Sequence, residues 1–160
     1  STLIEKIDLL EEKADDAATL MLDLADNDLA DSTLQRAVGL GEQLETLLNS
    51  LVSSSFEYRD LLDRQTTGLV EKEMTNMYDD ILLSVQEINN ELSTNSASDI
   101  SDQLSSTSNE IKLLVEGTGS IFSHKMTQLK AIDLATTKLA SAENDINMVN
   151  DSLFTLLVSI

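Results

Sequence analysis

The sequence predicts an all-α protein: an elongated antiparallel bundle of long, interrupted helices, or two such modules stacked. Apolar residues recur alternately three and four positions apart along most of the chain, an average spacing of about 3.5 that keeps one helix face against its neighbours. The 160 residues include no proline and only 5 glycines, so few tight turns are expected. Aromatic residues make up only 3% of the chain, which leaves aliphatic side chains and methionine to build the core, as is typical of bundles.

The first predicted helix runs from about residue 1 to residue 26. Its apolar face consists of Leu3, Ile7, Leu10, Ala14, Ala17, Met21 and Leu24. It should end at Asp26, Asn27 and Asp28, because these residue types favour turns and caps over helix interiors. Asp31 or Ser32 can then cap the next helix.

The second predicted helical segment is long and has a weak point at Gln65-Thr66-Thr67-Gly68. Before that point the apolar face is Leu34, Ala37, Gly41, Leu44, Leu48, Leu51, Ser55, Tyr58 and Leu62. After it the face continues through Val70, Met74, Met77, Ile81, Val85, Ile88 and Leu92. The clearest break in the chain follows at Ser93-Thr94-Asn95-Ser96, and Ser96 or Ser98 can cap the next helix.

The last predicted helical segment is interrupted at Gly117-Thr118-Gly119, where two glycines cost about 2 kcal/mol relative to alanine in a helix interior. Before the interruption the apolar residues are Ile100, Leu104, Ile111, Leu114 and Val115, and directly after it they are Phe122, Met126 and Leu129. The most regular pattern in the chain closes it, with Ile132, Ala135, Leu139, Ala142, Ile146, Val149, Leu153, Leu156 and Ile160. We name these nine residues the terminal seam.

These breaks predict a hairpin of two long, interrupted arms that reverses near residue 96, with the first helix packed beside the end that carries the termini. Two modules would then stack: one of about 1–64 plus 124–160, at the end that carries the termini, and one of about 65–123. The alternative is a compact four- or five-helix bundle in which Gly68, or the Gly117-Gly119 segment, is a true turn.

Composition and motifs argue against catalysis. The net charge of -19 disfavours a broad surface for nucleic acid or anionic lipid, and the lack of cysteine rules out disulfides and thiolate chemistry. No Gly-x-Ser-x-Gly, phosphate-binding loop or dinucleotide fingerprint occurs. A calcium loop starting at Asp26 would need a glycine at Asp31 and a glutamate at Ala37, so capping is the better interpretation. We expect a non-catalytic domain without cofactor or metal, and the chain has no apolar run of 18 residues that could span a membrane.

Basic and aromatic residues gather at one level of the predicted hairpin and form a candidate site for an anionic ligand or an acidic partner. The candidate ligand- or partner-binding residues are Tyr58, Arg59, Arg64, Lys72, His124, Lys125 and Lys130. The competing interpretation is that Arg59, Arg64 and Lys72 form weak surface pairs with nearby acidic residues, namely Glu57, Asp60, Asp63 and Glu73.

Two segments carry a family resemblance. Ala30–Ala37 (ADSTLQRA), after a short acidic turn, and Leu134–Ala142 (LATTKLASA) are similar to segments of sensor histidine kinases of the trimethylamine-N-oxide sensor type. The whole cysteine-free, proline-free pattern resembles periplasmic helical-bundle sensor domains of such two-component kinases and of chemoreceptors.

The resemblance implies a periplasmic domain between two transmembrane helices outside this fragment. It also implies a homodimer and a periplasmic binding protein or small solute as the recognised partner. Helix displacement would relay the signal. The alternative is a structural coiled-coil protein, such as a flagellin-like filament or a spectrin-like rod; a spectrin-like repeat normally has a core tryptophan, which this chain lacks.

Overall fold

The chain is all-α, as predicted. A computed structural model describes residues 1–26, 32–93 and 98–160, and the regular structure of these ranges consists of five helices. They are α1 (Leu3–Asp26), α2 (Ser32–Arg59), α3 (Arg64–Leu92), α4 (Ser98–Val115) and α5 (Ile121–Val158). The caps proposed at Asp31 and Ser96 lie outside the described residues. The acidic turn considered as a calcium loop also lies outside them, apart from its first residue, Asp26.

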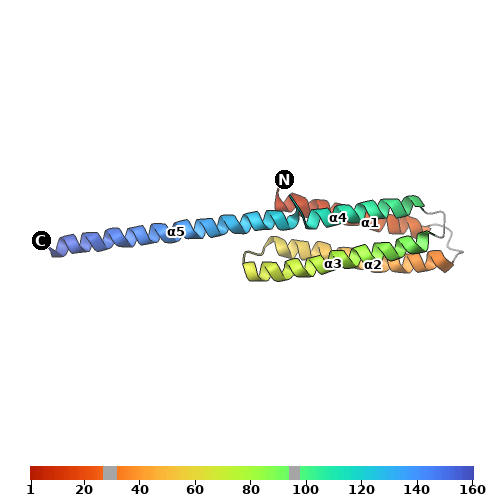
Figure 1. Cartoon of the computed structure of the whole chain (residues 1–160), viewed down its shortest axis with the longest axis horizontal. Coiled ribbons are helices and arrows are strands. Elements are labelled where there is room, and N and C mark those ends of the chain that lie inside the picture. Colours follow the sequence, from red (N-terminus) through yellow and green to blue (C-terminus); the bar gives the residue numbers. More distant parts are fainter. Residues whose placement is uncertain (27–31, 94–97) are drawn as a thin grey trace. The chain divides into compact units, whose positions relative to one another are not determined.

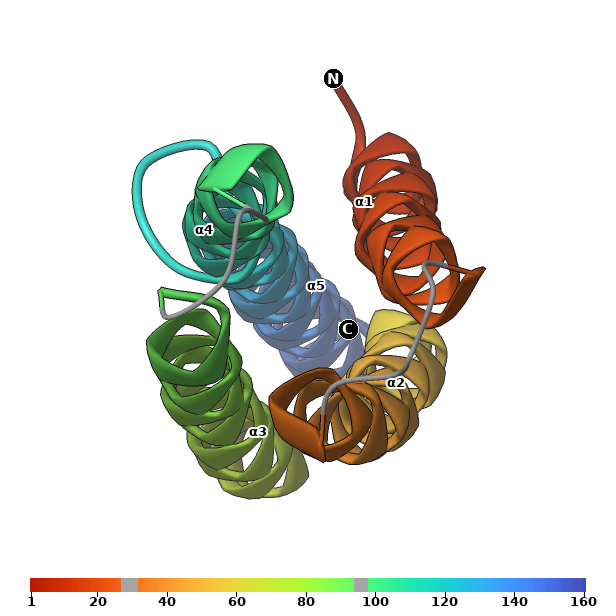
Figure 2. The same cartoon turned by 90° about the vertical axis from the view of Figure 1, so that its right-hand side faces the viewer.

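The chain divides into two compact units, Ser1–Lys125 and Met126–Ile160, and the boundary lies inside α5. This division differs from the two predicted modules, which stay a prediction. In the first unit α1 packs on α2 and α4, and α3 packs on the same two helices. Successive helices run in opposite directions (Figure 1), and the end-on view shows all four around one centre (Figure 2). This is a four-helix bundle.

The predicted apolar faces of α1 to α4 form the core of this bundle. α1 buries the whole predicted set from Ile7 to Leu24. α2 buries Ala37, Leu44, Leu48, Leu51, Ser55 and Tyr58 of the predicted face. The other two predicted leucines differ: Leu34 is half-buried, and Leu62 is exposed in the turn after α2. In α3 and α4 the most buried residues are Met74, Tyr78, Ile81, Val85, Ile88, Leu92, Leu104, Ile111, Leu114 and Val115. Burial of these side chains is the main source of stability of the bundle, because it removes apolar surface from water.

The predicted hairpin of two long arms is wrong, since α2 turns back onto α3 instead of continuing. The turn lies at Asp60–Asp63, and Gly68, a candidate for a turn, lies inside α3. Asp63 caps α3: its carboxylate accepts hydrogen bonds from the backbone N–H of Thr66 at 2.7 Å and from the Thr66 hydroxyl at 2.7 Å. This cap provides a hydrogen-bond partner for a backbone N–H that has none within the first turn of α3. The cap therefore stabilises a chain reversal at Asp60–Asp63, where the apolar spacing alone suggests a continuous helix.

The predicted interruption near Gly117 and Gly119 is confirmed. α4 ends at Val115 and α5 begins at Ile121, and the two glycines have positive φ values of 125° and 72°. Residues with a Cβ atom rarely adopt this conformation, so glycine is needed here. The Ser120 hydroxyl then caps α5 by accepting a hydrogen bond from the Ser123 N–H at 3.2 Å.

Two glycines of α2 provide a matched test of the packing between α1 and α2. A Cβ atom added to Gly41 would lie 2.9 Å from Sδ of Met21, whereas one added to Gly39 would meet nothing within 4 Å. We expect Gly39→Ala to stabilise the protein by up to about 1 kcal/mol, because alanine is the better helix former. Gly41→Ala should lose most or all of this gain, since Met21 must move. Thermal unfolding of both variants checks this, and equal gains would contradict the close approach.

Candidate functional site

The first turn of α5 is attached to the bundle by a buried lysine. Lys125 is 0% exposed, and its Nζ atom donates hydrogen bonds to the carbonyl oxygens of Arg59 at 2.7 Å and Leu61 at 2.8 Å. These carbonyls lie at the end of α2 and in the turn after it, where backbone oxygens lack helical partners and the helix dipole is negative. An ammonium group from another helix therefore completes the C-terminus of α2.

Two aromatic rings complete this contact, which we name the Lys125 junction (Tyr58, Arg59, Leu61, Phe122 and Lys125). Nζ of Lys125 lies 5.3 Å from the centroid of the Tyr58 ring, and the Phe122 ring lies 5.6 Å from the Tyr58 ring. The Tyr58 hydroxyl donates to Glu71 of α3 at 2.5 Å. Burial lowers the pKa of the Lys125 ammonium and raises the pKa of the Tyr58 hydroxyl, because both charged forms would be poorly solvated.

The junction brings together three of the seven predicted site residues, Tyr58, Arg59 and Lys125. Nε of Arg59 pairs with Asp60 at 3.1 Å, which is the surface pairing that the competing interpretation expects. Arg64 and Lys72 are exposed on α3, His124 is half-buried on α5, and Lys130 is exposed in the second unit. The ligand-binding role of these residues stays a prediction.

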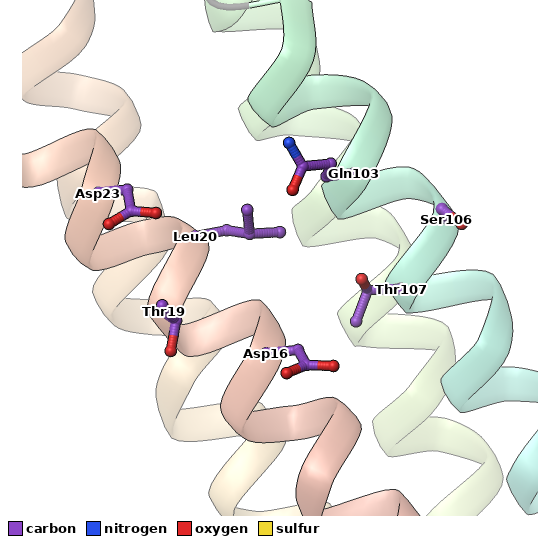
Figure 3. Close-up of a pocket in the computed structure, with 7 residues that line it drawn as sticks. All are labelled: Asp16, Thr19, Leu20, Asp23, Gln103, Ser106 and Thr107. Atoms are coloured by element: carbon purple, nitrogen blue, oxygen red, sulfur yellow. The ribbon is translucent and has the colours of Figure 1, made fainter.

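A shallow pocket that was not among the sequence-based predictions lies between α1 and α4. Its volume is about 350 Å³. Figure 3 shows the residues that line it, Asp16, Thr19, Leu20 and Asp23 from α1 and Gln103, Ser106 and Thr107 from α4. Two carboxylates with hydroxyl and amide groups suit a small polar or positively charged group.

A second pocket of about 310 Å³ lies along the same pair of helices. It is lined by Lys6, Leu9, Lys13, Glu110, Leu113, Leu114, Thr118 and Gly119. Nζ of Lys13 pairs with Glu110 at 2.9 Å and lies 3.7 Å from Asp16, which also lines the first pocket. The Lys13 ammonium donates a hydrogen bond to the Glu110 carboxylate, which raises the pKa of Lys13. We name the two pockets together the α1–α4 groove.

The α1–α4 groove offers hydrogen bonds and charges for recognition. None of the described residues forms a His, Cys, Asp or Glu group that could hold a metal ion. A sequence signal for the groove exists: Asp16, Thr19 and Asp23 recur at helical spacing beside the buried seam of α1. Their partners on α4 depend on how the helices pair, which spacing within one helix does not specify.

Known proteins provide no match for this chain. No family model matches it, and no characterised protein or solved structure is significantly similar to it. None of the described helices combines the length and apolar character needed to cross a membrane.

A tyrosine connects α3 to the segment between α4 and α5 and predicts a pH dependence. The Tyr78 hydroxyl donates a hydrogen bond to Glu116, and burial, with help from this bond, raises the pKa of Tyr78 from 10.0 to about 12. Between these values the unfolded chain has lost the proton while the folded chain keeps it. The contribution of Tyr78 to stability is therefore complete below pH 10 and is lost as the pH rises through 12.

We expect Tyr78→Phe to make the alkaline loss of stability less steep in this window. Denaturant unfolding at several pH values from 9 to 12 measures the slope for both proteins. Tyr58→Phe is the matched comparison. Burial raises the pKa of Tyr58 as well, so this variant should also make the alkaline loss of stability less steep. An unchanged slope in Tyr78→Phe would contradict the assignment.

Proposed function

We propose that the chain is the periplasmic signal-input domain of a bacterial membrane receptor, either a two-component sensor kinase or a chemoreceptor. The domain itself performs no catalysis and needs no cofactor in this proposal. Its partner is a small solute or a periplasmic binding protein, and it acts as a homodimer. The observation that carries the proposal is that one helix, α5, belongs to both compact units and is attached to the bundle through the Lys125 junction.

The α1–α4 groove is the proposed place of recognition. It lies beside α4, which connects to α5 through only five residues, 116–120. Glu116 in this connection accepts the hydrogen bond from Tyr78 of α3, and Ile121 at the start of α5 is buried. A ligand that changes the spacing of α1 and α4 would therefore act on the first turn of α5.

The Lys125 junction is the proposed point of transmission. Its hydrogen bonds join α5 to the turn between α2 and α3, so a shift of that turn or of α4 displaces the start of α5. A helix is stiff along its axis, and a ligand that favours one packing of the bundle changes the population of the α5 position. Such a displacement can be relayed to a membrane-spanning helix.

A change of helical phase inside α5 tests this proposal in the receptor that carries the chain. Two alanines inserted between Lys130 and Ala131 rotate the following residues by about 200°, whereas seven inserted residues return them to within about 20° of their original phase. We expect the two-residue insertion to change kinase or chemotaxis output strongly and the seven-residue insertion to preserve most of it.

The gene supplies a second test. It should encode apolar spans of membrane length on both sides of these residues and a kinase or chemotaxis signalling region. Equal output from the two insertion variants and the parent, or a gene without such spans, would overturn the proposal.

A further inference from the structure

The terminal seam is exposed to solvent along the second unit. From Ala135 onward each seam residue is exposed, and the six large side chains among them are Leu139, Ile146, Val149, Leu153, Leu156 and Ile160. The helix that carries them is rich in residues that are weak helix formers, including Thr136, Thr137, Asn144, Asn147 and Asn150. A helix of this composition depends on packing of its apolar face for stability.

We propose that a second copy of the chain covers the terminal seam and forms a parallel, in-register two-stranded coiled coil. Residues of the seam repeat every seven positions from Ile132 to Ile160 and again from Ala135 to Leu156. This is the spacing at which two identical helices insert side chains into each other over their whole length. Eight layers of contact lie within α5, from Ile132 to Leu156, and Ile160 follows the end of the helix at Val158.

Charge complementarity favours the parallel register. Lys138 directly precedes the seam residue Leu139, and Glu143 directly follows the seam residue Ala142. In a parallel pair, a residue that directly precedes a seam position faces the partner residue five positions further along the chain. Lys138 therefore faces Glu143 of the second copy, and the symmetry of the dimer forms this contact twice. Within one helix the two residues are five positions apart and do not face each other, and neither has an oppositely charged residue three or four positions away.

The antiparallel arrangement of the same length is less favourable. With Ile132 opposite the partner's Leu156, Glu143 would lie against the partner's Glu143. Like charges at these flanking positions destabilise a coiled coil. Charge therefore selects the parallel dimer. This inference rests on the homodimer of the proposed function and specifies the surface and the orientation of its contact.

Matched substitutions on α5 test the seam in the full 160-residue chain. Ile146 and Met148 are 59% and 60% exposed, but only Ile146 belongs to the terminal seam, and Met148 lies about 200° around the helix from it. We expect sedimentation equilibrium to show a dimer for the parent chain. Ile146→Ser combined with Val149→Ser should weaken dimerisation by roughly tenfold or more, and Met148→Ser should leave it unchanged.

Two further variants test the orientation. Lys138→Glu and Glu143→Lys should each weaken the dimer at low salt, and the double exchange should restore it. Because the chain has no cysteine, Ile146→Cys places the single thiol at a position that meets its own copy only in the parallel register. We expect rapid disulfide cross-linking of Ile146→Cys and not of Met148→Cys.

Several results would overturn the inference. They are a monomer at all concentrations, equal effects of the Ile146 and Met148 substitutions, and failure of the charge exchange to restore association. Signalling output from a receptor whose input domain stays monomeric would overturn the seam dimer and the homodimer of the proposed function, and would leave its signal-input role intact. Unchanged thermal unfolding of the first unit in each variant establishes that the bundle remains folded.

Discussion

Replacing Leu10 with alanine should destabilise the four-helix bundle by about 2–5 kcal/mol. Leu10 is 0% exposed in the core of the bundle, so truncation removes buried apolar atoms and leaves a cavity among helices that are held on several sides. The effect is large compared with the 5–15 kcal/mol that typically separates folded from unfolded domains.

Leu22 provides the matched control for this prediction. It is a leucine in the same helix, and its exposed fraction is 62%. Leu22→Ala should change the free energy of unfolding by no more than about 0.5 kcal/mol. Denaturant unfolding of the two variants gives the comparison, and similar costs at both positions would mean that α1 does not pack on the face described.

Replacing Lys125 with methionine should destabilise the bundle by about 2–3 kcal/mol. Methionine keeps an apolar side chain of similar length but cannot donate hydrogen bonds to the carbonyl oxygens of Arg59 and Leu61. These oxygens would then lose a charged donor in a part-buried contact, which is costlier than the loss of a fully solvated one. The variant should also loosen the first turn of α5.

Lys72→Met is the control, because Lys72 is exposed on α3. Its unfolding free energy should stay within about 0.5 kcal/mol of the parent. Hydrogen exchange of amides in residues 121–125 measures the local effect, and we expect faster exchange in Lys125→Met alone. Unchanged exchange and stability in Lys125→Met would show that its hydrogen bonds do not anchor the helix.

The helices were largely predictable from the sequence, and one turn was not. The end of α1 at Asp26 and the break around Gly117 and Gly119 are encoded by strong local signals. At Asp60–Asp63 the apolar spacing continues to Leu62, so it suggests one helix; the signal for a turn is the weaker pair of Asp63 and Thr66. Gly68 is helical because packing of α3 outweighs a propensity cost of about 1 kcal/mol.

The candidate site was predictable only in part. The basic and aromatic residues Tyr58, Arg59 and Lys125 do come together, but the ammonium of Lys125 is directed to backbone carbonyls inside the protein. Composition cannot show this, since the direction of a side chain depends on which turn lies opposite it. The α1–α4 groove was missed because its two walls are more than 70 residues apart in sequence.

Apart from the turn at Asp60–Asp63, the sequence by itself determined which residues are helical and which face of each helix is apolar. Both follow from spacing within a few turns of one chain segment. The tertiary structure decided which face meets which: α2 pairs with α3, and the faces of α1 to α4 close on one another while the terminal seam stays exposed. The physical reason is that apolar stripes of equal spacing fit one another almost interchangeably. The choice among them depends on turns, caps and a few buried polar contacts such as those of Lys125.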